Sequence, residues 1–125
     1  MRNVATLGLF LLAVCLGLGG GHAQAQNGTA TFNLTNNARY QIFIKFYSQD
    51  TVWPGVSSHY ILADNLQHSF PLACTIGEKI CYGGGYSQNG SGSYWGIGFF
   101  GNQGCSACCL ICGPNNPTAN WSLND

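Results

Sequence analysis

The chain has 125 residues, only 6% of which are charged, and its formal net charge is zero. Nucleic acids and anionic membranes bind positively charged surfaces, and the chain has too few basic residues to form one. We therefore expect neither as a partner. The length suits one domain with a modest hydrophobic core.

The first 25 residues have the layout of a secretory signal peptide. Arg2 supplies a positive charge, residues 7–18 form an apolar run, and residues 23–25 (AQA) match a small-x-small cleavage site. The run is too short for a membrane span. We therefore expect secretion or export to the periplasm after cleavage near Ala25. Cleavage two residues earlier and a lipoprotein signal ending at Cys15 are the alternatives.

Residues 26–125 are predicted to form a single, mostly β domain. Apolar and polar residues alternate in several short runs separated by Gly, Asn and Pro. The strands are expected over residues 29–35, 40–48, 58–63, 68–74, 94–100 and 118–123. The glycine-rich stretch 83–93 is interpreted as a loop. This pattern is typical of a small antiparallel β-sandwich or barrel.

The stretch TIGEKI at residues 75–80 predicts a tight hairpin turn. With Gly77 and Glu78 as its two central residues, the turn would be of type II′. Cys74 would then face Cys81 across the ribbon, with both sulfurs on the same side. They could bond to each other, or both could point at the cysteines that follow.

Four more cysteines lie within eight residues, at Cys105, Cys108, Cys109 and Cys112. Their spacing of i, i+3, i+4 and i+7 predicts one face of a short helix. The Gly-Pro pair that follows would end that helix. A compact knot is the alternative.

The six cysteines of residues 26–125 are expected to form disulfides, because an even number in a short exported domain is typical of a disulfide framework. Two bonds from the hairpin to the cluster would leave two cluster cysteines to pair with each other, although the sequence leaves the connectivity open. Redox or metal use of the two C-x-x-C spacings is the alternative. No βαβ unit of the thiol oxidoreductases is visible, and four ligands on two helical turns would make tetrahedral zinc coordination difficult. We therefore expect no metal and no cofactor.

The sequence assigns no catalytic residues. His59 and His68 lie in predicted strands without a nucleophile motif beside them. A glycosidase would have only four carboxylate side chains in residues 26–125 from which to draw its pair. We therefore expect that the protein is not an enzyme.

Aromatic side chains next to uncharged polar loops are the best candidates for ligand binding. An aromatic ring packs on the C–H groups of a sugar, while neighbouring amides and hydroxyls bind its hydroxyl groups. These rings could equally fill the core of a small domain. The candidates are Trp53, Tyr86, Tyr94, Trp95 and Trp121.

Several short motifs carry a resemblance to a known kind of domain. They are KFYS at 45–48, WPG at 53–55, GEKICYG at 77–83, YWGIG at 94–98 and GCSACCLIC at 104–112. Together they resemble a small cysteine-rich secreted bacterial domain of unassigned function. That domain is similar to C-terminal accessory modules of some bacterial caspase-like proteins. The resemblance implies an accessory or recognition role and transfers no catalytic residue.

These observations favour a secreted, non-catalytic recognition module that binds a glycan or protein ligand at or outside the cell surface. A small secreted effector, toxin or enzyme inhibitor is the first alternative, because disulfides protect such proteins against proteolysis. A thiol oxidoreductase or metal-binding protein is the second alternative.

Overall fold

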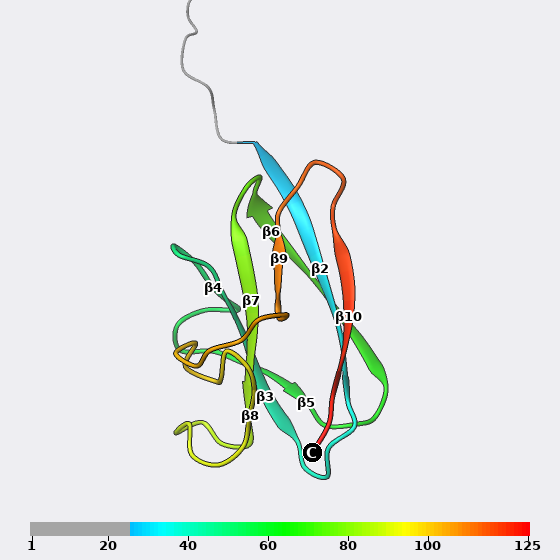
Figure 1. Ribbon diagram of the computed structural model, residues 1–125, viewed down its shortest axis with the longest axis vertical. Helices are drawn as coiled ribbons and strands as arrows, with labels where there is room; N and C mark the ends of the chain where they lie inside the picture. Colours follow the sequence, from blue (N-terminus) through cyan, green and yellow to red (C-terminus); the bar gives the residue numbers. More distant parts are fainter. Residues whose placement is uncertain (1–25) are drawn as a thin grey trace, which may run out of the picture.

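The computed structural model describes residues 26–125, so the predicted signal peptide lies outside the described residues. Within this range nine strands form two sheets (Figure 1) and no residue is helical. The prediction of a mostly β domain is confirmed. No helix in the described part of the chain could cross a membrane.

The smaller sheet has three strands in the order β10-β2-β6. The strands are β2 (Asn27–Asn36), β6 (Gln67–Thr75) and β10 (Thr118–Leu123). The central strand β2 pairs antiparallel with β6 along its length but parallel with β10. The antiparallel arrangement predicted from the sequence is confirmed for the other strand pairs of residues 26–125, and only the last strand runs parallel to its neighbour.

The larger sheet has six strands built around the antiparallel pair of β3 and β7. Strands β4 and β5 pair with β3, while β8 and β9 pair with β7. The strands are β3 (Ile42–Tyr47), β4 (Val52–Trp53), β5 (Tyr60–Leu62), β7 (Lys79–Gly85), β8 (Tyr94–Gly96) and β9 (Cys109–Ile111).

The alternating residues predicted from the sequence form the core between the two sheets. Phe32 of β2 and Phe46 of β3 are fully buried, and their ring centroids lie 4.8 Å apart. Leu34 and Ile44 on the same strands are also fully buried. Because each such side chain contributes about 1.5–3 kcal/mol when buried, the alternation fixes which face of each strand points inward.

The predicted type II′ hairpin between Cys74 and Cys81 is wrong. Strands β6 and β7 belong to different sheets, and the turn between them carries the chain from one sheet to the other. The amide of Glu78 donates to the carbonyl of Thr75 at 2.9 Å, so Ile76 and Gly77 are the central residues. Gly77 has a φ of 96°, which suits the second central position of a type II turn rather than the first position of a type II′ turn.

The predicted cysteine-bearing helix is also wrong. Residues 105–108 form an irregular loop, and β9 follows at once as a strand. The physical reason is strand pairing. The first half of β7 pairs with β9 from Lys79–Ile111 to Cys81–Cys109. Backbone pairing to β7 satisfies hydrogen bonds that an isolated helix of two turns would satisfy poorly.

The stretch Gly83–Gly85, predicted from the sequence to begin a loop, completes β7. The chain after β8 folds directly onto this strand, and a Cβ at Gly83 would overlap the carbonyl oxygen of Gly98. The missing side chains therefore allow a close backbone approach, one of the positions at which glycine occurs inside strands.

We predict that Gly83→Ala lowers the free energy of unfolding by about 1–3 kcal/mol or more, because the added methyl group overlaps backbone that cannot move freely. Gly104→Ala is the matched control, since a Cβ there meets no atom within 4 Å. The control should change stability by less than about 0.5 kcal/mol. Urea unfolding of both variants measures the difference, and equal stability would show that the loop does not lie on β7.

Candidate functional site

The six cysteines form three disulfides, in agreement with the predicted disulfide framework, and two of these bonds connect the turn between β6 and β7 to the C-terminal cysteines. Cys74–Cys112 joins the end of β6 to the residue after β9, with Cα atoms 6.2 Å apart, and so links the two sheets. Cys81–Cys109 joins β7 to β9, with Cα atoms 4.0 Å apart. Cys105–Cys108 closes a small loop just before β9.

A pocket of about 820 Å³ lies beside the first two disulfides. We call it the Trp53 pocket. Its walls are the end of β3 with the turn to β4, the end of β6 with the turn to β7, and the loop after β8. It is lined by residues 47–51, Trp53, 73–75, 77–79, Cys81, Ile97 and Gly101.

Glu78 holds the two turns of the Trp53 pocket together. One of its carboxylate oxygens accepts a hydrogen bond from the Ser48 hydroxyl at 2.5 Å, and the other accepts from the Thr75 amide at 2.9 Å. The Ser48 hydroxyl oxygen also accepts from the amide of Thr51 at 3.0 Å. Both carboxylate oxygens of Glu78 therefore accept hydrogen bonds from the pocket walls, so we expect Glu78 to stabilise the pocket rather than bind a ligand.

Apart from Tyr47, the remaining polar side chains of the Trp53 pocket are exposed. Asp50 and Lys79 are exposed, while the half-buried Trp53 also packs against the core. The Tyr47 hydroxyl donates to the Phe99 carbonyl, and burial raises the pKa of this phenol. The pocket lining therefore combines two aromatic residues, Tyr47 and Trp53, with polar groups.

Trp121, another predicted ligand-binding residue, has a structural role. Its ring stacks on Phe32 at 5.1 Å between centroids and contacts Tyr82 at 5.3 Å. Its indole N–H donates to the Ala107 carbonyl at 2.7 Å, which fixes the loop between Cys105 and Cys108. The alternative interpretation, that the ring fills the core, fits this residue.

The rings of Tyr86 and Trp95 contact each other beside the last two residues of the chain. Their centroids are 5.0 Å apart, and Tyr40 contacts Tyr86 at 5.3 Å. Trp95 donates to the Asn124 carbonyl at 2.7 Å, and Tyr86 donates to the Asp125 carboxylate at 3.0 Å. Their polar groups thus hold the chain end.

Tyr94 remains exposed at 49% on β8. The structure therefore does not gather the five predicted aromatic residues on one surface, and of the five only Trp53 lines the pocket. Sequence reasoning missed the polar residues at the pocket margin. The only available signal was the turn chemistry of residues 48–51 (SQDT).

The two described histidines have ordinary environments. His68 hydrogen-bonds the Asp64 carboxylate at 2.7 Å, and this bond lowers the pKa of Asp64. The ring of His59 packs edge-on against Phe43 at 5.1 Å and lies 6.0 Å from Phe99. Among the hydrogen bonds of residues 26–125, none joins either imidazole to a serine hydroxyl.

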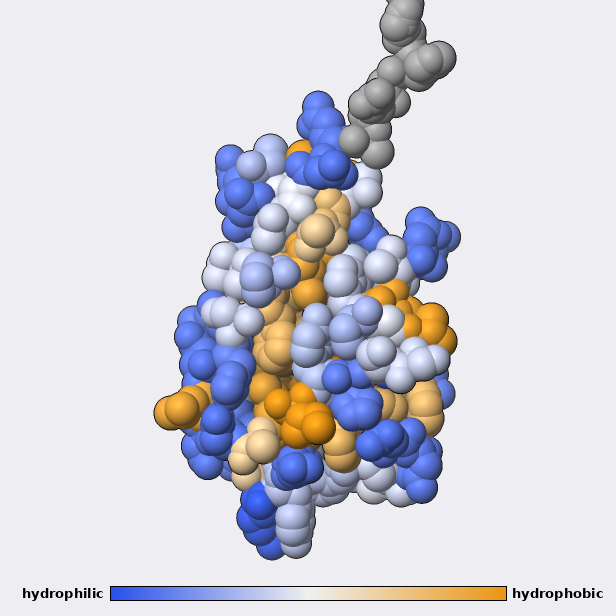
Figure 2. Space-filling model, turned by 180° about the vertical axis from the view of Figure 1, so that it is seen from behind, coloured by the Kyte–Doolittle hydropathy of each residue, from blue (hydrophilic) through white to orange (hydrophobic). Residues whose placement is uncertain are grey.

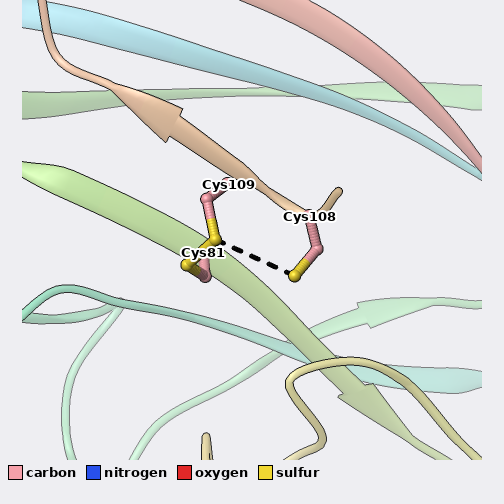
Figure 3. A group of neighbouring side chains, drawn as sticks. All are labelled: Cys81, Cys108 and Cys109. Carbon is pink, nitrogen blue, oxygen red and sulfur yellow. Dashed lines mark hydrogen bonds between the residues drawn. A yellow bond between two sulfur atoms is a disulfide. The ribbon is translucent and has the colours of Figure 1, made fainter. Parts of the chain in front are cut away.

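Three sulfur atoms gather where the disulfides meet (Figure 3). Those of Cys81, Cys108 and Cys109 all lie within 4.8 Å of one another, and Cys108 Sγ is 3.9 Å from Cys109 Sγ. The three residues lie close enough together to share a metal ion, but in the structure Cys81 is bonded to Cys109 and Cys108 to Cys105, so none of these sulfurs is a thiolate ligand.

Comparisons with known proteins identify neither a family nor a structural neighbour, since no family model, curated protein or solved structure matches the chain. The resemblance to accessory modules of caspase-like proteins therefore stays a prediction.

We predict that the ion pair at the chain end makes stability depend on acid pH. Arg39 lies 3.0 Å from the Asp125 carboxylate, and its hydrogen bond is the largest cause of the lowered pKa of Asp125. A lowered pKa in the folded state stabilises the fold above the unfolded value of about 3.9, and this contribution disappears as pH falls through the folded value.

Asp125→Asn should therefore lower the melting temperature at pH 7, and the difference from the unchanged protein should vanish at the acid end of a pH series. Arg39→Gln is the matched control, because it removes the other partner of the same pair. Combining the two changes should cost less than the sum of the single effects. A pH-independent difference for Asp125→Asn would contradict the ion-pair explanation.

Proposed function

We propose that residues 26–125 are a secreted, non-catalytic recognition module that binds a glycan through the Trp53 pocket. The observation that carries this proposal is the combination of a half-buried tryptophan with exposed polar groups in a pocket of about 820 Å³. This volume falls within the range of about 300–1,000 Å³ typical of small-ligand sites.

The chemistry of the pocket margin favours an uncharged or weakly charged ligand. Gln49, Asp50 and Thr51 present amide, carboxylate and hydroxyl groups beside the aromatic ring. Such groups bind sugar hydroxyls as donors and acceptors, while the ring packs on C–H groups. With Asp50, Glu78 and Lys79 as its charged residues, the pocket lining has little net field to attract a strongly charged molecule.

The scaffold we propose is a β-sandwich. Buried side chains of both sheets contact each other, as Phe32 and Phe46 do, and this is how the faces of a sandwich pack. The disulfides are compatible with secretion, because such bonds persist in oxidising compartments.

A protein ligand is the second candidate, and the surface hydrophobic residues favour it. Val56, Ile61 and Leu66 are 78%, 49% and 67% exposed. Figure 2 shows hydrophobic residues in a band down one face of the molecule, between hydrophilic margins. Exposed apolar surface of this kind is used for contacts between proteins, as in an enzyme inhibitor or a toxin.

Screening the exported protein on an array of neutral and acidic polysaccharides tests the proposal. We expect retention by a neutral polysaccharide and, for Trp53→Ala, a loss of affinity of about tenfold or more. Tyr94→Ala is the control, because this aromatic residue is exposed and lies outside the pocket lining. Circular dichroism of both variants confirms that they fold, and Trp53→Leu, which keeps apolar bulk without an aromatic ring, replaces Trp53→Ala if the alanine variant does not.

Three outcomes would overturn glycan binding at this site. They are the absence of any retained polysaccharide, equal binding by the Trp53 variant, and an equal loss in the Tyr94 variant. Binding to a protein bait without polysaccharide binding would support the second candidate instead.

A further inference from the structure

We propose that Cys81, Cys105, Cys108 and Cys109, once reduced, form a four-thiolate site for one thiophilic divalent cation such as Zn²⁺. The inference goes beyond the recognition function and does not depend on it. It concerns a second chemical state of sulfur atoms that are disulfide-bonded in the structure.

Three of the four sulfur atoms already lie close enough together to share one zinc ion. In a tetrahedral site with Zn–S bonds of about 2.3 Å, neighbouring sulfurs are about 3.8 Å apart. Cys108 Sγ and Cys109 Sγ are 3.9 Å apart, and Cys81 Sγ lies within 4.8 Å of both (Figure 3). Cys105 Sγ is bonded to Cys108 Sγ and therefore lies next to the same group. After reduction, side-chain rotation would suffice to separate the two bonded pairs.

The structure removes the geometric objection to a metal that the sequence had raised. The four ligands do not lie on two turns of one helix. Cys105 and Cys108 belong to a loop, Cys109 begins β9, and Cys81 lies on β7. A C-x-x-C loop combined with cysteines from other segments is a common source of zinc ligands.

Contacts that do not involve these sulfurs hold their backbone in place. Three residue pairs join β7 to β9, from Lys79–Ile111 to Cys81–Cys109. The Tyr82 amide donates to the Cys108 carbonyl at 3.1 Å, and Trp121 donates to the Ala107 carbonyl at 2.7 Å. The four ligands should therefore remain close together after their own bonds are broken.

The Cys74–Cys112 disulfide, which is not part of the proposed site, is the best protected against reduction. Cys74 and Cys112 are 7% and 1% exposed, whereas Cys105 faces solvent. Because thiol–disulfide exchange requires access to a sulfur, a reductant should reach Cys105–Cys108 first and Cys74–Cys112 last. The remaining disulfide would then keep the two sheets linked in the metal-bound state.

A dithiol is the reductant for the two disulfides of the proposed site. Each protein disulfide takes two electrons and two protons from one dithiol, which leaves as a cyclic disulfide, so two dithiols give four protein thiols. Binding of one Zn²⁺ by the four thiols forms four Zn–S bonds and releases four protons. No oxidant and no other cofactor takes part.

The test starts from the exported protein treated with limiting dithiothreitol, which is then removed without oxygen. Alkylation and peptide mass spectrometry should find free thiols at Cys81, Cys105, Cys108 and Cys109. After Zn²⁺ is added, native mass spectrometry should show one metal ion per chain, and the same four thiols should resist alkylation. Cys105→Ser should weaken zinc binding by at least about tenfold. Ser106→Ala, which changes a neighbouring side chain that is not a ligand, should leave zinc binding unchanged.

Several results would overturn the proposal. They are a protein with these four free thiols that binds no zinc, zinc that protects Cys74 and Cys112 instead, reduction of Cys74–Cys112 before the other two bonds, and unchanged affinity in Cys105→Ser. If reduction alone unfolds the chain, zinc must restore the strand signal in circular dichroism, and failure to do so also rejects the site.

Discussion

The Cys74–Cys112 bond is the constraint on which the rest of the structure depends, because it is the disulfide that joins the two sheets. Two backbone hydrogen bonds flank it, from Gly77 to the Cys112 carbonyl at 2.7 Å and from Cys112 to the Glu78 carbonyl at 2.8 Å. The bond closes a long loop, with a sequence separation of 38, whereas Cys105–Cys108 has a separation of 3. Because Cys81–Cys109 already spans most of this loop, loop-closure entropy gives about 2.5–3 kcal/mol for the first bond and about 1.5 kcal/mol for the second. The small core of a domain of about 100 residues benefits from such a contribution.

The candidate binding site lies next to the disulfide-bonded cysteines. Cys74 and Cys81 line the Trp53 pocket, and Glu78 in the adjacent turn holds the pocket's two walls together. A change in the bonding of Cys81 would therefore occur at the wall of the site proposed for the glycan. The pocket proposed for the glycan and the metal site proposed for the reduced protein therefore share Cys81.

Local patterns in the sequence predicted much of the fold. The alternation in β2 and β3 identified their inward faces, because burial of one face leaves a period of two in the residues. Features that depend on distant partners could not be predicted in this way. The spacing of the cluster cysteines fits a helix, yet the edge of β7 makes part of this segment a strand. Gly77 marked a turn correctly, but only the sheet pairing shows that this turn connects different sheets. The aromatic residues were recognised as a set, although Trp121 packs on Phe32 and Trp53 lines the pocket, a distinction that requires the tertiary contacts.

The central role of the Cys74–Cys112 bond is tested most directly by urea unfolding of two double variants, Cys74→Ala/Cys112→Ala and Cys105→Ala/Cys108→Ala. The quantity compared is the free energy of unfolding. We predict that loss of the bond between the sheets destabilises the protein more, by about 1 kcal/mol, because the loop that it closes is longer even while Cys81–Cys109 remains intact. Equal destabilisation, or a larger loss from Cys105→Ala/Cys108→Ala, would contradict the central role of the Cys74–Cys112 bond.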